Sequence, residues 1–139
     1  MEKVFRLRDV MTPSPKTIAI DAHLSDAQAM MEKLGVNHLP VMDSGIVESI
    51  ITDRDIKRFT LPAHKLSADE DLLVSDIAST RAFIADVDDP LEKVLRSMME
   101  QENAAVVVLE QGELTGIFTE TDACRVLADM LAVAGLNPT

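Results

Sequence analysis

The chain has 139 residues, the size of one compact domain, and 47% of them are hydrophobic, so it can bury a real core. Its net charge of −11, with 13 Lys and Arg against 24 Asp and Glu, argues against a nucleic-acid partner, whose phosphates need clustered cations. Four Phe and no Trp or Tyr also leave few platforms for base stacking.

The first copy of a repeated pattern opens with a predicted strand at residues 16–20. A helix follows from Ser25, where Gln28 suits a capping box, and Gly35 suits the position just past the helix end. The apolar face of this helix comprises Ala27, Met30, Met31 and Leu34. An amphipathic helix packed on a strand is therefore expected here.

A predicted hairpin and a second helix complete the first copy. Strands at residues 39–42 and 46–51 flank a turn at 43–45. The second helix begins near Thr52 and runs to about Phe59. The first copy thus has the order strand, helix, strand, strand, helix.

A charged linker at residues 61–74 leads to the second copy. The first helix of this copy starts at Asp89-Pro90, because proline is tolerated at the first helical position. Its apolar face comprises Leu91, Val94, Leu95, Met98 and Met99. This pattern matches the first copy.

The second copy closes with the same elements as the first. Strands are predicted at residues 104–109 and 114–119, and a last helix from about residue 120 to 134, ended by Gly135. The alternation of strands and helices in both copies predicts an α/β fold.

The two copies align from residue 9 to residue 59 without a gap when the sequence is shifted by 67 residues. The identical pairs are Asp9/Asp76, Asp21/Asp88, Leu24/Leu91, Met31/Met98, Val41/Val108, Gly45/Gly112, Ile50/Ile117, Thr52/Thr119, Asp55/Asp122 and Arg58/Arg125. Two copies favour a pseudo-twofold pair over a solenoid. Since a copy of this size buries little surface alone, we expect the two sheets to pack together and leave two equivalent clefts.

Both copies place Thr-x-x-Asp directly after an apolar strand, at Thr52 to Asp55 and at Thr119 to Asp122. A strand that feeds a helix here puts a hydroxyl and free amides at the positive helix start, which favours a phosphate. The carboxylate one turn later can accept hydrogen bonds from two ribose hydroxyls. The alternative is an ordinary helix cap, with threonine as the N-cap and an acid in the first turn.

These motifs resemble a known family. Residues 9–13 (Asp-Val-Met-Thr-Pro), 39–41 (Leu-Pro-Val) and 52–55 (Thr-Asp-Arg-Asp) resemble the successive signatures of a CBS motif, and residues 116–122 resemble their counterpart in a second motif. The resemblance covers residues 9–133. Two such motifs in tandem form what is called a Bateman module, and the chain resembles a standalone pair of this kind.

The resemblance implies a fold, a function and a set of site residues. The two CBS motifs, residues 1–60 and 75–139, would pack sheet to sheet with pseudo-twofold symmetry. The family binds AMP, ADP, ATP and related adenosyl ligands between the motifs and usually controls an attached or partner protein. Cleft A would combine Thr12, Lys16, Thr17, Ile18, Val36, Asn37 and His38 with Thr119, Thr121 and Asp122. Cleft B would combine Ser79, Ile84, Asn103, Ala104 and Ala105 with Thr52, Arg54 and Asp55.

The two clefts differ in how well they match the family pattern. Ser49 stands where the second copy has Gly116, and Val107 stands where the first copy has Pro40, and both departures weaken cleft B. Cationic side chains favour cleft B, which has Arg54, Lys57 and Arg58 where cleft A has Lys16 and Arg125. Cleft A matches better and is the preferred site.

Other reactive residues carry no recognisable chemistry. His23, His38 and His64 are widely spaced, with no Cys or acid at metal-ligand intervals, so no metal site is expected. His38 suits a contact with a ligand as well as it suits a strand edge. Cys124 has no base pattern beside it and is expected to pack as a small residue. Without a nucleophile and base, we expect no enzyme activity and no catalytic cofactor.

The expected setting is the cytoplasm. A single cysteine fits a reducing compartment, no apolar run reaches the roughly 18 residues of a membrane span, and residues 1–6 show no signal-peptide stretch. We expect a regulatory, ligand-sensing homodimer without nucleic-acid or membrane partners. The alternative is a structural dimerisation module with no nucleotide. The dimer would form through apolar helix residues Ile56, Phe59, Val126, Leu127 and Met130.

Overall fold

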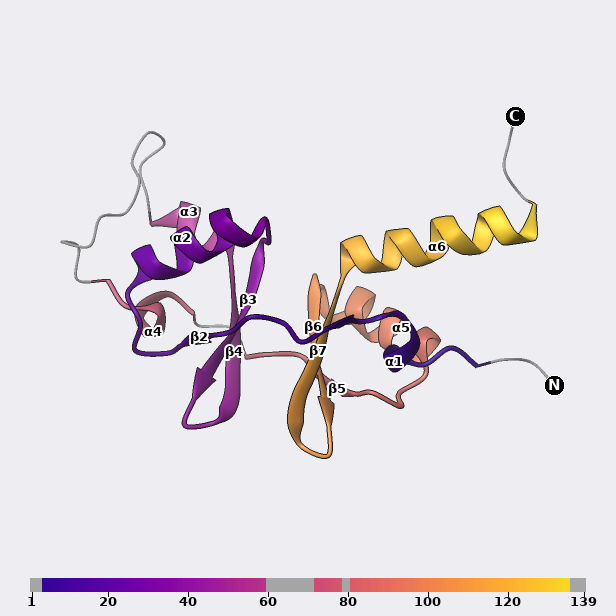
Figure 1. Ribbon diagram of the computed structural model, residues 1–139, viewed down its shortest axis with the longest axis horizontal. Coiled ribbons are helices and arrows are strands. Elements are labelled where there is room, and N and C mark those ends of the chain that lie inside the picture. The colour runs from indigo at the N-terminus through magenta and orange to yellow at the C-terminus, as the bar shows by residue number, and fades with distance from the viewer. Residues whose placement is uncertain (1–3, 60–71, 79–80, 136–139) are drawn as a thin grey trace. The chain divides into compact units, whose positions relative to one another are not determined.

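The computed structural model describes residues 4–59, 72–78 and 81–135. The chain divides into two compact units (Figure 1), which are described separately. Unit 1 comprises Met1–Ser14 and Phe83–Thr139, and unit 2 comprises Pro15–Ala82. Within the described ranges no helix has the length and apolar character of a membrane span.

Unit 2 contains a three-stranded sheet in the order β2-β3-β4. The strands are β2 (Ile18–Ala19), β3 (His38–Asp43) and β4 (Ile46–Thr52). β2 runs parallel to β3, whereas β3 and β4 form an antiparallel hairpin. The hairpin turn uses Gly45 at φ +81°, a left-handed conformation that favours glycine. This turn lies where the sequence predicted it.

The helices of unit 2 are α2 (Leu24–Leu34), α3 (Asp53–Arg58) and α4 (Val74–Ile77). Its core is aliphatic, and its fully buried members include Leu24, Ala27, Leu39, Val41, Ile51 and Val74. Val74, the last residue of the predicted linker at 61–74, is thus part of a core helix, whereas residues 61–71 of that linker lie outside the described residues.

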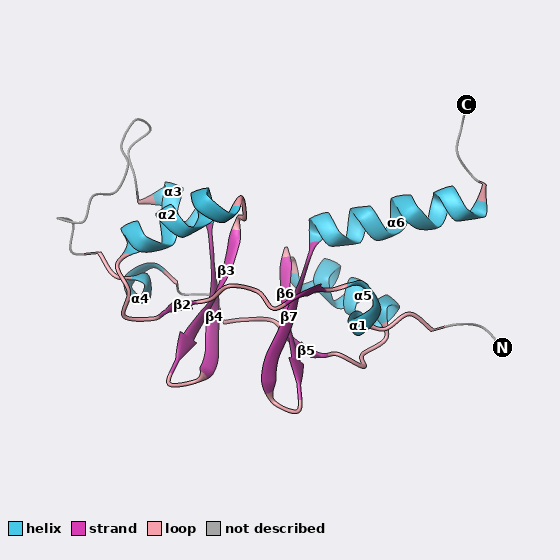
Figure 2. Ribbon diagram, viewed as in Figure 1, coloured by secondary structure: helices cyan, strands magenta, loops and turns pink. Residues whose placement is uncertain are grey.

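Unit 1 contains a four-stranded sheet in the order β1-β7-β6-β5 (Figure 2). The strands are β1 (Thr12–Pro13), β5 (Ile84–Asp86), β6 (Ala105–Glu110) and β7 (Glu113–Thr119). The helices are α1 (Leu7–Val10), α5 (Leu91–Gln101) and α6 (Glu120–Ala134). Phe118 and Leu7 are its largest fully buried side chains, so the short α1 is anchored in the core.

Each unit includes a short helix from the other sequence copy. In unit 1 the amides of Leu7 and Arg8 donate to the carbonyls of Asp89 and Val87, at 3.2 and 2.9 Å. The equivalent bonds in unit 2 run from Val74 and Ser75 to the carbonyls of Ala22 and Ile20, at 2.9 and 3.0 Å. Adding 67 to the residue numbers of Leu7, Arg8, Ala22 and Ile20 gives their counterparts, so the repeat extends to individual hydrogen bonds. The compact units therefore cut across the two sequence copies.

This exchange replaces one predicted helix cap. The sequence placed a capping box at Ser25, but α2 begins at Leu24, and the N-cap residue His23 makes no side-chain cap bond. The amide of Leu24 donates instead to the carbonyl of Leu72 at 2.9 Å. In unit 1 the amide of Leu91 donates likewise to the carbonyl of Phe5, at 2.8 Å. A neighbouring backbone thus satisfies a helix-start amide in each unit.

Several helix predictions are confirmed and others are wrong. The last helix spans Glu120–Ala134 and ends at Gly135, as predicted. Pro90 is the N-cap of α5 and not its first helical residue. Leu34 and Met99 were assigned to apolar core faces, but they are 40% and 70% exposed. Leu34 is the last residue of α2, and Met99 lies beside the buried Met98 but on a side of α5 that faces away from the core.

Candidate functional site

The corner where β7 meets α6 gathers the side chains of the second Thr-x-x-Asp motif. Thr119 is the N-cap of α6, and its hydroxyl oxygen accepts a hydrogen bond from the Asp122 amide at 3.4 Å. Asp122 Oδ2 accepts in return from the Thr119 amide at 2.9 Å and from its hydroxyl at 3.2 Å. This reciprocal capping box fixes Asp122 at the helix start.

The other carboxylate oxygen of Asp122 is occupied from two directions. The Thr12 hydroxyl donates to Oδ1 at 3.1 Å, and Arg125 donates to the same oxygen at 2.7 Å. Asp122 is 7% exposed, whereas the Arg125 side chain is 53% exposed. A carboxylate offers about four acceptor positions, and here four donors fill them. A ribose hydroxyl can reach this carboxylate only by replacing one of them.

The corner where β4 meets α3 has the same cap but a more open carboxylate. Asp55 Oδ2 accepts from the Thr52 amide at 3.0 Å, and the Asp55 amide donates to the Thr52 hydroxyl oxygen at 3.1 Å. Among the residues that the structure describes, no donor reaches Asp55 Oδ1. Arg58, the repeat equivalent of Arg125, forms no ion pair with Asp55 in this part of the chain. The accessible carboxylate is thus Asp55, whereas the sequence favoured the cleft of Asp122.

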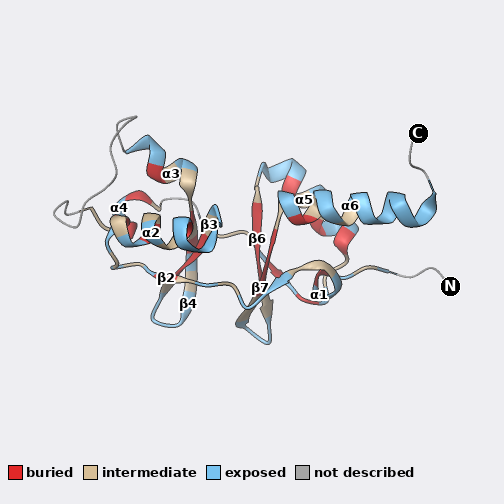
Figure 3. Ribbon diagram, turned by 45° about the horizontal axis from the view of Figure 1, so that its top comes forward, coloured by how far each residue is buried: buried red, intermediate tan, exposed pale blue. Residues whose placement is uncertain are grey.

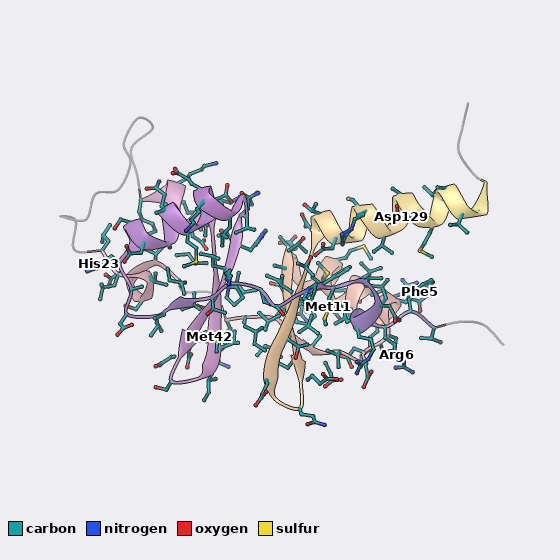
Figure 4. All side chains as sticks on the ribbon, viewed as in Figure 1. Phe5, Arg6, Met11, His23, Met42 and Asp129 are labelled. Carbon is teal, nitrogen blue, oxygen red and sulfur yellow. The ribbon has the colours of Figure 1, made fainter. Side chains whose placement is uncertain are left out.

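Gly116 explains how the N-terminal segment that carries Thr12 can approach Asp122. It pairs with Pro13 where β1 crosses β7, and a Cβ there would collide with Met11 Sδ and lie 3.0 Å from the Thr12 carbonyl oxygen. Glycine therefore permits the close approach that brings Thr12 to Asp122. Figure 4 marks Met11 on the segment that crosses β7.

Ser49 occupies the equivalent position in unit 2, where it forms an antiparallel bridge with Arg81. Arg81 is one residue past the equivalent of Pro13, so the pairing register differs between the units. Ser49 is 5% exposed, and its hydroxyl has no hydrogen-bond partner among the described residues. The departure from glycine seen in the sequence thus accompanies a different crossing.

The cleft residues assigned to the starts of β3 and β6 lie beside the Thr-x-x-Asp motif of their own unit. The carbonyl of Asn37 accepts from the Asp53 amide at 3.0 Å, and His38 pairs with Thr52 across the hairpin. In unit 1 the carbonyl of Ala104 accepts from the Glu120 amide at 3.0 Å. The residue before β3 is therefore hydrogen-bonded to the start of α3, and the residue before β6 to the start of α6.

The other predicted site residues are divided between the units. Unit 1 holds Thr12, Thr119, Thr121 and Asp122 of cleft A and Ile84, Asn103, Ala104 and Ala105 of cleft B. Unit 2 holds Lys16, Thr17, Ile18, Val36, Asn37 and His38 of cleft A and Thr52, Arg54 and Asp55 of cleft B. Ser79 lies outside the described residues. Ile18 is 4% exposed and packs in the core of unit 2, so only its backbone is available to a ligand.

Two hollows flank α6, and the sequence predicted neither. One, of about 760 Å³, lies beside α5 and is lined mainly by apolar residues such as Phe5, Leu95 and Leu127. The other, of about 700 Å³, lies beside α1 and includes Asp9, Arg125, Asp129 and Met130. Along much of its length α6 is exposed (Figure 3). The sequence feature that could have indicated these hollows is the apolar pattern of α6, which continues past the end of the sheet.

The residues proposed for a dimer interface have different environments. Ile56 is 3% exposed and packs in the core of unit 2, so its assignment to an interface was wrong. The reason is that α3 turns this residue inward onto the sheet. Phe59, Leu127 and Met130 are 54%, 58% and 44% exposed. Val126 is half-buried against the core of unit 1.

The isolated reactive residues form no cluster. No group of three or more His, Cys, Asp or Glu side chains suited to a metal ion is found in the described part of the chain. Cys124 is exposed and lines the hollow beside α5, so the prediction that it is packed was wrong. His23 is an exposed N-cap residue and His38 is half-buried, whereas His64 lies outside the described ranges.

Curated relatives of this chain include two proteins of similar identity but different length. "CBS domain-containing protein YhcV" of Bacillus subtilis is 25% identical over 111 residues, which cover 80% of this chain and 77% of that protein. "Uncharacterized protein MJ1225" of Methanocaldococcus jannaschii is 26% identical over 122 residues, 87% of this chain but 42% of that protein. The chain therefore spans most of one relative and less than half of the other.

Solved structures share the fold. A putative acetoin utilization protein (AcuB) from Vibrio cholerae gives a TM-score of 0.82 at 21% identity, over 96% of this chain and 99% of that one. The CBS domain pair of protein MJ0100, in complex with 5′-methylthioadenosine and S-adenosyl-L-methionine, gives 0.77 at 23% identity, over 92% and 99%. CBSX2 in complex with AMP gives 0.72 at 20% identity, over 91% and 98%. The family profile described as CBS domain matches residues 7–61 and 74–129, and the chain therefore belongs to the CBS-domain family, with two copies of the domain.

Proposed function

We propose that this chain is a regulatory module that senses adenine nucleotides or related adenosyl ligands at its two strand–helix corners. Both motifs form helix caps, as the alternative interpretation of Thr-x-x-Asp predicted, and the observation that carries the proposal is the carboxylate oxygen that the cap leaves over at Asp55: Oδ2 accepts from the Thr52 amide, whereas no donor among the described residues reaches Oδ1. The MJ0100 pair with its adenosyl ligands and CBSX2 with AMP support the ligand class, because both share this fold.

The chemistry of the corners suits a ribose. A carboxylate accepts hydrogen bonds from two neighbouring hydroxyls, and each charge-assisted bond contributes about 1.5–3 kcal/mol. Asp55 has one oxygen available for such a bond, whereas Asp122 must first release a partner. We therefore expect the Asp55 corner to bind with the lower cost of rearrangement. The residues assigned above to clefts A and B remain the proposed contacts.

Calorimetry of ligand-stripped protein with AMP, ADP and ATP tests the proposal. Asp55→Asn and Asp122→Asn keep the side-chain shape but weaken acceptance from ribose hydroxyls, so each should reduce affinity by about tenfold or more at its own corner. Asp76→Asn is the matched control, because Asp76 also accepts a capping bond, from the Leu73 amide at 2.8 Å. This control should lose stability without losing affinity.

The outcomes separate the proposal from its alternative. If none of the three nucleotides binds the stripped wild-type protein, the chain is better explained as a structural dimerisation module. If they bind and both aspartate variants bind as well as Asp76→Asn, the ribose role is wrong.

We further propose that the chain forms a homodimer through α6. This helix exposes Leu127, Met130, Leu131 and Val133 by 58%, 44%, 38% and 91%, and such exposed apolar side chains mark interfaces when they lie together. Sedimentation at micromolar concentration should give a dimer, and Val133→Glu with Leu127→Glu should give a monomer. A wild-type monomer under the same conditions would overturn this assembly.

We propose no catalytic role for the chain. Among the described residues that line the hollow, no histidine stands beside the exposed thiol of Cys124 as a base. Incubation of the pure protein with ATP or AMP should leave both intact. Sustained hydrolysis that is lost in Asp55→Asn or Asp122→Asn would contradict this assignment.

A further inference from the structure

The Asp122 carboxylate, whose acceptor positions are all filled, influences which adenosyl ligand can bind at the corner of β7 and α6. Its two oxygens already accept four hydrogen bonds, from Thr12, from Arg125 and twice from Thr119. A bound ribose must therefore displace a donor that the unliganded protein supplies. The ligand must then offer the displaced donor a new hydrogen-bond partner, and which donor is displaced determines the chemistry of that partner. This inference rests on the proposed function.

Arg125 is the donor that can leave with the least disturbance of the fold. The Thr119 amide and hydroxyl belong to the helix cap, and Thr12 is fixed by the pairing of β1 with β7. The Arg125 side chain is long and 53% exposed, and its one hydrogen bond to Asp122 is to Oδ1, at 2.7 Å. Its removal breaks an ion pair with a carboxylate whose side chain is only 10% exposed.

Among the described residues of its surroundings, Arg125 is the one side chain that could neutralise a phosphate. Of the described residues that line the hollow beside α1, Arg125 is the only cation, and Asp9 and Asp129 contribute two carboxylates. Figure 4 marks Asp129 on α6. With Arg125 the three side chains sum to a charge of −1, and without it they would sum to −2. An incoming phosphate therefore depends on this guanidinium, which binds phosphate through paired hydrogen bonds.

We propose that Arg125 is a specificity-determining residue that makes the Asp122 corner prefer phosphorylated adenosines over uncharged or cationic adenosyl ligands. The ribose takes the place of the guanidinium on Asp122, and the phosphate supplies the guanidinium with a new anion. 5′-Methylthioadenosine breaks the ion pair and brings no anion of its own, so the displaced arginine has only the Asp9 and Asp129 carboxylates that line the same hollow. S-adenosyl-L-methionine brings a sulfonium cation close to the ribose, and its carboxylate stands at the far end of the methionine chain beside an ammonium group. Affinity at this corner should fall in the order AMP, 5′-methylthioadenosine, S-adenosyl-L-methionine.

The experiment compares these three ligands by calorimetry on the ligand-stripped full chain at about pH 7.5, where the AMP phosphate is mostly dianionic. Asp55→Asn serves as the background, so that the measured site is the Asp122 corner. In this background AMP should bind about tenfold more tightly than 5′-methylthioadenosine. Adding Arg125→Gln should reduce that preference to about threefold or less. Arg125→Lys should retain part of it, because the charge remains but the paired hydrogen bonds do not.

Arg96→Gln is the matched control. Arg96 is another exposed helix arginine, with a loose 3.7 Å contact to Glu92, and its loss should leave the preference for AMP unchanged. If Asp55→Asn does not fold, the nuclear magnetic resonance signal of the Arg125 Nε–H group in the wild type gives the same information. AMP should shift this signal strongly, through the new phosphate bond, and 5′-methylthioadenosine should shift it less.

Two outcomes would overturn the inference while leaving the proposed function intact. One is equal affinity for AMP and 5′-methylthioadenosine at the Asp122 corner. The other is a preference for AMP that persists in Arg125→Gln. By contrast, failure of all three ligands to bind the wild-type chain would defeat the proposed function itself.

Discussion

Replacing Gly116 by alanine should destabilise unit 1 and loosen the closed corner. The new Cβ would meet two parts of the crossing segment: Met11 Sδ, and the Thr12 carbonyl oxygen at 3.0 Å. The Met11 side chain can rotate away, but the Thr12 carbonyl belongs to β1 and can give way only if the strand moves. Overpacking of this kind costs about 1–3 kcal/mol. Movement of β1 also weakens the Thr12–Asp122 bond, a charge-assisted bond in the range of about 1.5–3 kcal/mol.

Taken together, Gly116→Ala should lower the free energy of unfolding by roughly 2–4 kcal/mol. Urea denaturation followed by circular dichroism measures this loss. Gly112→Ala is the control, because its Cβ would meet nothing within 4 Å and its cost arises only from the left-handed backbone at φ +82°, about 1 kcal/mol. If β1 moves, Thr12→Val should cost less in the Gly116→Ala background than in the wild type. A cost for Gly116→Ala of under about 0.5 kcal/mol would refute this reasoning, as would additive effects of the two substitutions.

Three further substitutions test other parts of the structure. Ser49→Ala removes a buried hydroxyl that lacks a partner among the described residues, and it should raise the free energy of unfolding by up to about 1 kcal/mol; a loss of stability would show that the hydroxyl is bonded. The hydrogen bond from Arg8 lowers the pKa of the Asp88 carboxyl in the folded protein. The stabilisation from this bond is therefore complete above the usual aspartate pKa of about 3.9, and it is lost as the pH falls through the lower pKa of the folded state. Thermal melting of Asp88→Asn should therefore change less than that of the wild type between about pH 5 and pH 2, and parallel curves would contradict the assignment. Thr121→Ala should leave stability within about 0.5 kcal/mol, because this residue is exposed, but it should weaken AMP binding in calorimetry if Thr121 contacts the ligand.

Local signals made much of the fold predictable from the sequence. The turn at Gly45 and the start of α6 at Thr119 depend on residues that are close together in the chain, and both lie where the pattern placed them. The helix cap that the sequence offered as the alternative interpretation of Thr-x-x-Asp is present at both motifs, since the hydrogen bonds that form it join residues three apart. The shift of 67 residues correctly paired Asp55 with Asp122.

The features that distinguish the two corners could not be predicted in this way. α1 and α4 have four residues each, too few to show a helical period, and the hydrogen bonds that hold α1 come from residues about 80 positions away. The Thr12–Asp122 bond joins residues 110 apart, so no pattern within one copy of the repeat reveals it. Gly116 did give a signal, because it faced Ser49 in the repeat alignment. Only the crossing of β1 and β7 shows what that glycine permits.

A crystal structure of the ligand-stripped chain with AMP would test the central claim most directly. The proposed function predicts that the ribose hydroxyls lie within hydrogen-bond distance of the Asp55 or Asp122 carboxylate. At the Asp122 corner, Arg125 should have moved from the carboxylate to the phosphate. AMP bound with its ribose away from both aspartates would contradict the account, and so would an empty protein at saturating AMP.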